Sequence, residues 1–176
     1  MNRKSGFTLI ELMLTIMIAA ILAALAAPSF RDMLINNSLT AETNSLIGDL
    51  ALARSEAVKR GARVTVCASS DGATCAGGKD WTLGRLVFVD DGVAGLVDGG
   101  DGDASHMLRR SGAASSGLTL QETSEFVPKG WVSFLPTGFS SSTGALTMCR
   151  SAFFGRVVSV SNSGRSSLAK TAAKCS

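Results

Sequence analysis

Apolar residues are concentrated at the start of the chain. From Thr8 to Ala27 every residue is apolar except Thr8, Glu11 and Thr15. A helix of this length spans about 30 Å at about 1.5 Å per residue, which matches the hydrocarbon core of a bilayer. Residues 7–27 are therefore predicted to form a membrane-spanning helix.

An amphipathic pattern follows over residues 28–60. Small or apolar side chains recur at alternating steps of three and four residues, as on one face of a helix: Leu39, Thr43, Leu46, Leu50, Ala53 and Ala57. Four charged residues lie off this stripe: Glu42, Asp49, Arg54 and Lys59. We expect the helix to continue to about Arg60, where Gly61 ends it.

Beyond Gly61 the pattern changes to short apolar segments separated by Gly, Ser, Asp and Pro. Strands are predicted at residues 63–68, 83–89, 107–110, 118–121, 131–134, 145–149 and 156–160, with a last short strand around Leu168. The fold class is then α+β, with one long helix packed on one or two small antiparallel sheets. Trp81, Trp131 and Phe134 are expected to fill the core of this head, residues 61–176.

Four cysteines form a short pair, Cys67 and Cys75, and a longer pair, Cys149 and Cys175. Neither pair has the close spacing of a zinc site, so we expect two disulfides and an oxidising compartment. Of the three possible connectivities, we favour the sequential one, which closes a tight hairpin loop and ties the C-terminal tail to a strand.

Arg3 and Lys4 precede the apolar segment. The positive-inside rule keeps this short N-terminus cytoplasmic and sends the head across the membrane. The alternative is a cleaved secretory signal, which the alanines at Ala23 to Ala27 would suit, although its apolar region should be only about 7–15 residues long.

Glu11 is a carboxylate within a membrane span, which is costly enough to require a partner or a function. Its neighbourhood, residues 4–11 (KSGFTLIE), resembles the prepilin peptidase site of type IV pilins and type II secretion pseudopilins. That resemblance implies cleavage between Gly6 and Phe7 and N-methylation of Phe7. It also implies that Glu11 pairs with the terminal amine of a neighbouring subunit, so that two buried charges neutralise each other.

The head resembles the FimT/FimU/GspH group of minor pilins and H-type pseudopilins. The matching segments are residues 54–60, 67–72 with Cys75, 81–88, 134–138, 155–158 and 162–165. The resemblance implies a leader (1–6), a stem helix (7–27), an amphipathic half-helix (28–60) and a periplasmic head (61–176) on a single-pass inner-membrane protein. It implies a low-abundance subunit that helps to start a filament at or near its tip.

The partners implied are other major and minor pilins or pseudopilins, the prepilin peptidase, the inner-membrane assembly platform and, before assembly, membrane lipid. Two disulfides and the Gly164-Arg165 tail favour a type IV pilus, with an H-type pseudopilin of a type II secretion system as the alternative. His106 is the single histidine and no catalytic constellation surrounds it, so we expect no enzyme, cofactor or metal.

Charge adds two further hypotheses. Residues 144–176 contain no acidic residue and five cations: Arg150, Arg156, Arg165, Lys170 and Lys174. They suggest double-stranded DNA binding during DNA uptake, against the alternative of plain solvated charges. Arg165 is followed by Ser166 and Ser167, so the second arginine of a Gly-Arg-x-Arg tail is missing.

The segment from Asp90 to Asp103 contains five aspartates and no lysine or arginine. Its composition suggests calcium, but oxygen side chains do not alternate regularly and no Glu closes the loop. A solvated hairpin loop is the expectation there.

Overall fold

The structure is a computed structural model that describes residues 7–97, 106–124 and 130–175. Helix α1 runs from Leu9 to Arg60, and the chain divides into two compact units, residues 1–38 and 39–176. The N-terminal unit ends within the helix, so α1 contributes to both units.

In the N-terminal unit, α1 begins after Thr8, whose Oγ1 accepts a hydrogen bond from the amide of Glu11 at 3.3 Å. This is the N-cap arrangement that satisfies one of the free amides of the first turn. The helix contains an apolar window with a mean hydropathy of 2.5, whose side chains are not buried in the protein, and it is long and apolar enough to cross a membrane. The helix continues through Pro28.

In the second unit, α1 carries the predicted stripe on its buried side. The six residues of that stripe have at most 1% of their surface exposed: Leu39, Thr43, Leu46, Leu50, Ala53 and Ala57. Asp49 was predicted to lie off the stripe, and this was wrong because its side chain is fully buried. The helix ends at Arg60, and Gly61 follows with φ +64°, a left-handed conformation that glycine adopts without strain.

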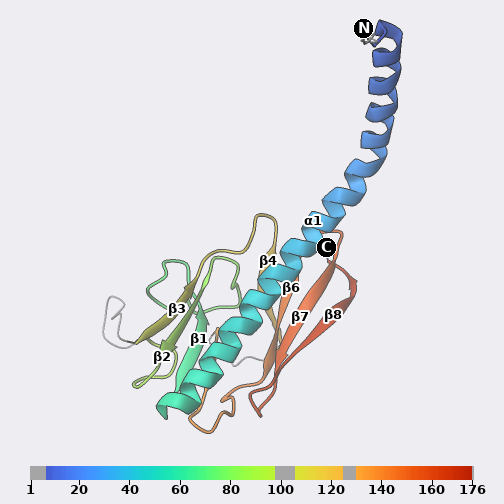
Figure 1. The fold of residues 1–176 in the computed structure, drawn as a ribbon. Helices are drawn as coiled ribbons and strands as arrows, with labels where there is room; N and C mark the ends of the chain where they lie inside the picture. The colour runs from blue at the N-terminus through green and yellow to red at the C-terminus, as the bar shows by residue number, and fades with distance from the viewer. Residues whose placement is uncertain (1–6, 98–105, 125–129, 176) are drawn as a thin grey trace. The chain divides into compact units, whose positions relative to one another are not determined.

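Two four-stranded antiparallel sheets complete the second unit (Figure 1). One has the order β3-β2-β1-β5, with β1 at Val64–Ala68, β2 at Arg85–Val89, β3 at Met107–Ser111 and β5 at Trp131–Phe134. The other has the order β4-β6-β7-β8, with β4 at Thr119–Ser124, β6 at Gly144–Cys149, β7 at Phe154–Val160 and β8 at Ser166–Lys174. The predicted α+β class is confirmed.

The last strand is the main departure from the predicted elements. Around Leu168 the sequence predicts a short strand, but β8 spans nine residues and pairs with β7 from Val160 opposite Ser166 to Phe154 opposite Lys174. Its composition of Ser, Ala and Lys is weak for a strand, and the pairing with β7 outweighs that local preference.

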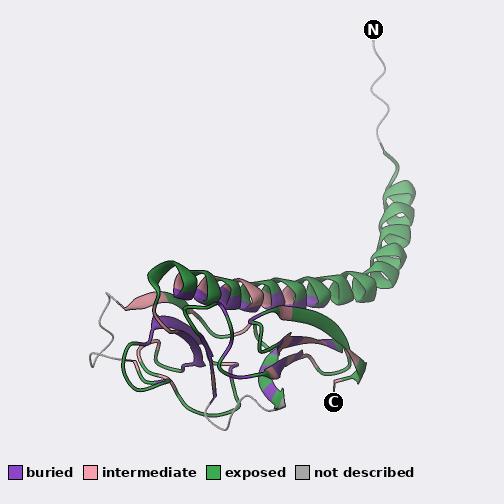
Figure 2. Ribbon diagram, turned by 90° about the horizontal axis from the view of Figure 1, so that it is seen from below, coloured by how far each residue is buried: buried purple, intermediate pink, exposed green. Residues whose placement is uncertain are grey.

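The core lies between α1 and the strands, and Figure 2 shows the buried residues of the helix on the side that faces them. Trp81 and Phe134 are buried as predicted. Trp131 is only half-buried and packs against the cluster that contains Cys67. A Cβ on Gly95 would lie 2.2 Å from the Trp131 ring, so only glycine permits this close approach.

Candidate assembly and binding surfaces

The residues predicted for processing and assembly lie at the start of the described chain. Phe7 is 79% exposed and Glu11 lies exposed in the first turn of α1. Gly6 lies outside the described residues. Within the described part of the chain no salt bridge neutralises Glu11, the single charged residue between Thr8 and Ala27. A carboxylate in this position requires a cation from elsewhere if it is to enter hydrocarbon at low cost.

Both expected disulfides are present. Cys67 joins Cys75 across a separation of 8 residues, and Cys149 joins Cys175 across 26, each with a Cα to Cα distance of 5.7 Å. The first bond ties β1 to the loop that follows it. The second ties the end of β6 to the tail after β8. The amide of Ala152 also donates to the Cys175 carbonyl at 3.0 Å, so the tail is fixed to its neighbouring loop by two kinds of contact.

An ionic cluster that sequence reasoning missed joins α1 to the first sheet. Arg85 on β2 is buried and donates to Asp49 at 3.0 Å and to Glu42 at 2.9 Å. Asp49 also accepts hydrogen bonds from Arg109 at 3.2 Å and from Ser111 at 2.9 Å. The signal available in the sequence was Arg85 itself, a cation at the start of an otherwise apolar strand.

The aspartate-rich segment starts with a structural residue. Asp90 was expected in a solvated loop, but it is buried and accepts hydrogen bonds from Arg63 at 2.8 Å, Thr65 at 2.5 Å and the amide of Gly95 at 2.9 Å. The expectation of a solvated loop was therefore wrong at this residue. The carboxyl group holds the turn after β2 against β1.

The neighbouring Asp91 is exposed, with Oδ2 3.2 Å from His106 Nε2. The remaining aspartates of this segment lie outside the described residues: Asp98, Asp101 and Asp103. Within residues 7–97, 106–124 and 130–175, no group of three or more His, Cys, Asp or Glu side chains is arranged to hold a metal.

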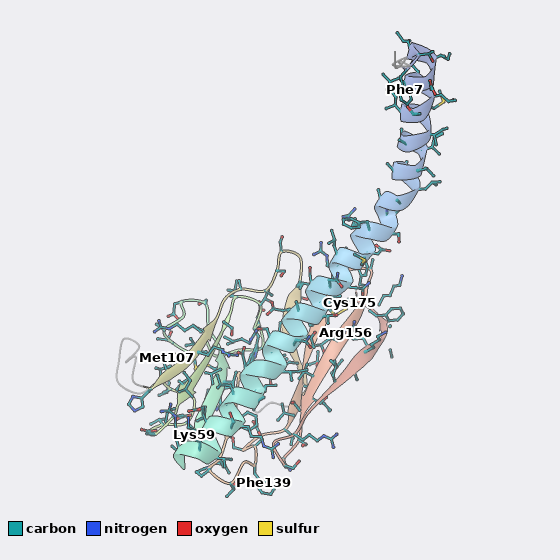
Figure 3. The ribbon with its side chains drawn as sticks, in the orientation of Figure 1. Phe7, Lys59, Met107, Phe139, Arg156 and Cys175 are labelled. Carbon is teal, nitrogen blue, oxygen red and sulfur yellow. A yellow bond between two sulfur atoms is a disulfide. The ribbon has the colours of Figure 1, made fainter. Side chains whose placement is uncertain are left out.

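The five cations of the C-terminal segment lie in three places. Arg156 on β7, which Figure 3 labels, is directly opposite Lys170 on β8, and Lys174 is opposite Phe154. Arg150 is separate, because its Nη1 donates to the Ser116 carbonyl at 2.6 Å. Like charges opposite each other on paired strands are destabilising. The described residues form no salt bridge with Arg156 or Lys170.

The fifth cation, Arg165, lies in the turn between β7 and β8. This turn is fixed to α1 by Arg54, which donates to the carbonyls of Gly138 at 3.0 Å and Ser163 at 2.9 Å. Gly164 has φ +73°, and a Cβ there would lie 2.2 Å from the Gly138 oxygen. The close packing of the two glycines places Arg165 beside the helix rather than beside Arg156.

Next to this turn lies a groove of about 560 Å³ along one side of α1. Its lining comprises Leu50, Ala51, Arg54, Ser55, Val58, Lys59, Gly164, Arg165 and Ser166. Aliphatic side chains thus alternate with three cations in one open depression, which we call the cationic groove.

Two further carboxyl groups have shifted pKa values. Hydrogen bonds from the Thr74 hydroxyl, from the amides of Thr74 and Ala73 and from Ser69 hold the pKa of Asp71 well below its usual range, within the loop closed by Cys67 and Cys75. Desolvation raises the pKa of Glu122 on β4, against a smaller opposing effect of Lys79. Neither group lines the cationic groove.

Comparison with known proteins gives a consistent result at both ends of the chain. The family model described as "Type II transport protein GspH" matches residues 42–164, well over half of the chain, and the "Prokaryotic N-terminal methylation motif" matches residues 1–27. Fimbrial protein Q of Moraxella bovis is 45% identical over 51 residues, which is 29% of this chain and 30% of that protein.

Solved structures support the fold. Two crystal structures of the Pseudomonas aeruginosa type IV minor pilin FimU are similar to this chain at 24% identity, with TM-scores of 0.57 and 0.52. Each comparison covers 76% of this chain and about nine-tenths of the other (90% and 91%). At this level of identity the similarity establishes a shared fold.

Proposed function

The chain belongs to the GspH family of pilin-like proteins, and on that premise we propose that it assembles into a type IV pilus and helps to start that assembly at the tip. The observation that carries this proposal is the presence, in one chain, of the N-terminal methylation motif over residues 1–27 and the family head over residues 42–164. Members of such families are structural subunits that assemble with other pilins after cleavage by the prepilin peptidase. The apolar helix fits the membrane-anchored precursor that this route requires.

Three features favour a pilus over a type II secretion system. The chain has two disulfides and the Gly164-Arg165 turn, and the relatives with matching segments are named as a fimbrial protein and a type IV minor pilin. The alternative is an H-type pseudopilin, which the description of the family model itself supports.

Two residues at the start of the stem helix, Phe7 and Glu11, would hold neighbouring subunits together. Cleavage after Gly6 creates an amine on Phe7, and Glu11 of a neighbouring subunit neutralises it in an apolar bundle. Either charge alone in hydrocarbon is costly, so the pairing favours subunits that are stacked in register. Before assembly the helix anchors the subunit in the inner membrane, with the head in the periplasm and the assembly platform as partner.

Deletion of the gene and its return in trans test the proposal. We expect the deletion strain to lose surface pili, which electron microscopy and shear preparations measure, and to secrete exoproteins normally. Normal piliation with a loss of exoprotein secretion would contradict the proposal and favour the pseudopilin alternative.

A second candidate function is DNA binding, favoured by the direct opposition of Arg156 and Lys170 on the β7–β8 hairpin, where Lys170 is exposed and Arg156 is half-buried. Two unneutralised cations held together favour an anionic partner such as a phosphate backbone. The full-length protein in lipid nanodiscs should then retard double-stranded DNA of any sequence. Each lost phosphate contact should lower the salt slope by about 0.9.

The matched variants follow from the geometry. Replacing both Arg156 and Lys170 with Ala should weaken retardation, while Arg150→Ala should have little effect because that guanidinium is engaged with Ser116. Arg165→Ala tests whether the turn contributes. Equal retardation by all of these variants would contradict DNA binding at this hairpin.

A further inference from the structure

The cationic groove joins apolar and cationic side chains in one depression of about 560 Å³. Leu50 lies buried in its floor, and Val58, which is 56% exposed, forms part of its wall. Pockets that bind small ligands measure roughly 300–1,000 Å³, so the groove has room for a few side chains of a partner. Exposed apolar surface gathered at a depression is typical of a binding site.

A second exposed apolar side chain extends the wall of the groove. Phe139 is 54% exposed and follows Gly138, where a Cβ would lie 3.3 Å from the Val58 side chain. The turn before Phe139 is closed by hydrogen bonds from the amide of Leu135 to the Phe139 carbonyl at 2.9 Å and from the amide of Gly138 to the Leu135 carbonyl at 2.8 Å. Figure 3 shows the labelled Phe139 and Lys59 at the same end of the second unit. The apolar surface therefore continues beyond the groove on a well-defined turn.

The charges that line the groove have one sign. Its described lining contains three cations, Arg54, Lys59 and Arg165, and no carboxylate. Lys59 is 75% exposed in its side chain with a 3.4 Å contact to Glu56, and Arg54 donates to carbonyl oxygens, which does not cancel its positive charge. Arg165 forms no salt bridge within the described residues. Because complementary charges across an interface select the partner, the groove favours carboxylates.

The turn that carries Arg165 is held in one conformation. The amide of Ser161 donates to the Arg165 carbonyl at 3.0 Å, and the amide of Gly164 donates to the Ser161 carbonyl at 2.8 Å. Arg54 ties the same turn to α1 through the Ser163 carbonyl. A surface that is ordered before it binds loses less entropy on association. The backbone of the groove therefore needs no rearrangement to receive a partner.

We propose that the cationic groove binds a segment of a different pilin-like subunit, in which aliphatic side chains stand next to Asp or Glu. The aliphatic side chains of that segment cover Leu50 and Val58, and its carboxylate pairs with Arg165. This inference rests on the proposed function, because a tip subunit of low abundance has other subunits as its neighbours.

Nucleic acid is the competing anion for this surface. A phosphate backbone offers negative charge but no aliphatic group, so Leu50 and Val58 would gain no apolar partner from it. Nine residues line the groove, against about 20–30 residues on each side of a stable interface. The contact therefore selects a neighbour among subunits that are already confined in one membrane, where the effective concentration is high.

Photocrosslinking in the native membrane tests the proposal with defined partners. Benzoylphenylalanine replaces Ala51, an exposed residue of the groove lining, and each other pilin-like subunit of the same cell is co-expressed in turn with its own tag. We expect a crosslink to one of these subunits, mapped to a segment with an aliphatic side chain next to Asp or Glu. The same crosslinker at exposed Gln121 on β4 should not label that segment. A crosslink only to a second copy of this chain, or to nuclease-sensitive material, would overturn the proposal.

Three variants of the crosslinking protein separate the charged and apolar contributions, with equal membrane levels checked by immunoblotting. Arg165→Glu reverses a charge in the groove and should lower the crosslink yield at least tenfold. Val58→Gln makes the wall polar and should lower the yield severalfold. Lys170→Glu is the control, a charge reversal of an exposed lysine on β8 outside the groove, and it should leave the yield unchanged. Equal yields from all three variants would contradict binding in the groove.

An exchange of charges between the two proteins is decisive. Arg replaces the mapped carboxylate of the partner, which should abolish the crosslink to the parent groove and restore it to the Arg165→Glu groove. Failure to restore the crosslink would overturn the proposal. If the chain is present in purified pili but does not crosslink in this way, only this inference fails, whereas absence from pili contradicts the proposed function itself.

Discussion

Arg85 Nε lies 3.0 Å from Asp49 Oδ2, with both side chains buried where α1 meets the first sheet. Asp49→Ala removes the buried carboxylate that accepts from Arg85, Arg109 and Ser111, while Arg85 keeps its pair with Glu42. The loss of these charged hydrogen bonds should lower the free energy of unfolding by about 1.5–3 kcal/mol. Urea unfolding followed by the fluorescence of buried Trp81 measures this change.

The control for that variant is Glu56→Ala, which removes the more accessible pair with Arg60 on the same helix. Exposed ion pairs contribute at most about 1 kcal/mol, so the effect should be small. If Asp49→Ala cost no more than Glu56→Ala, the buried cluster would not hold the helix on the sheet.

Glu122 should make stability depend on pH. Desolvation raises its pKa above the usual 4.5, and Oε2 has no hydrogen-bond partner within the described residues. A raised acid pKa means that the folded protein loses stability as pH rises through and above 4.5. Glu122→Gln should therefore gain stability relative to the parent between about pH 4 and pH 7, by roughly 1–3 kcal/mol at the upper end.

Glu56 serves as a control in the pH series, because its pKa is shifted in the opposite direction to that of Glu122. A hydrogen bond from Arg60 lowers the pKa of Glu56, so its contribution is present above 4.5 and is lost on acidification. A Glu122→Gln protein whose stability followed the parent's at every pH would contradict the assignment.

The two disulfides should differ in their contribution to stability. In the chain-entropy model the Cys149–Cys175 bond, with its separation of 26, stabilises by about 3.5 kcal/mol, and the Cys67–Cys75 bond, with its separation of 8, by about 2.5 kcal/mol. Replacing each pair with serines should reproduce that order in urea unfolding. A larger loss from the shorter loop would show that contacts around Cys67, rather than chain entropy, dominate.

The helix face that follows from the spacing of apolar residues could be predicted from the sequence. Features that depend on pairing between strands, or between residues distant in the sequence, could not. The stripe from Leu39 to Ala57 was predicted because a single buried helix face repeats every three or four residues. The length of β8 was not predicted, because its residues are weak strand formers and the strand forms through its pairing with β7. The burial of Asp49 was missed, because its buried partner, Arg85, lies 36 residues away in the sequence.

For the candidate binding surfaces too, the sequence identified the residues but not their arrangement in space. Five cations could be read from residues 144–176, yet only the register shows that Arg156 faces Lys170. The cationic groove combines Arg165 with Arg54 and Lys59 from α1, a set that is distant in sequence. No periodic signal brings such residues together.

Glu11 should matter for assembly rather than for folding. Glu11→Ala makes the helix more apolar, so membrane insertion should be at least as efficient, but the partner for the Phe7 amine is lost. We expect a severalfold fall in the amount of this subunit in sheared pili at equal membrane levels. Thr15→Ala is the control, because the Thr15 hydroxyl is already bonded to the Leu12 carbonyl and carries no charge. Equal incorporation of both variants would contradict the pairing.

Processing as a pilin and incorporation into a filament together define the function that we propose for this chain. Mass spectrometry of purified pili measures this directly, by identifying the N-terminal peptide of the incorporated protein. The expected peptide begins at N-methylated Phe7, which requires cleavage after Gly6. An N-terminal peptide that still begins at Met1 in assembled pili would contradict the account.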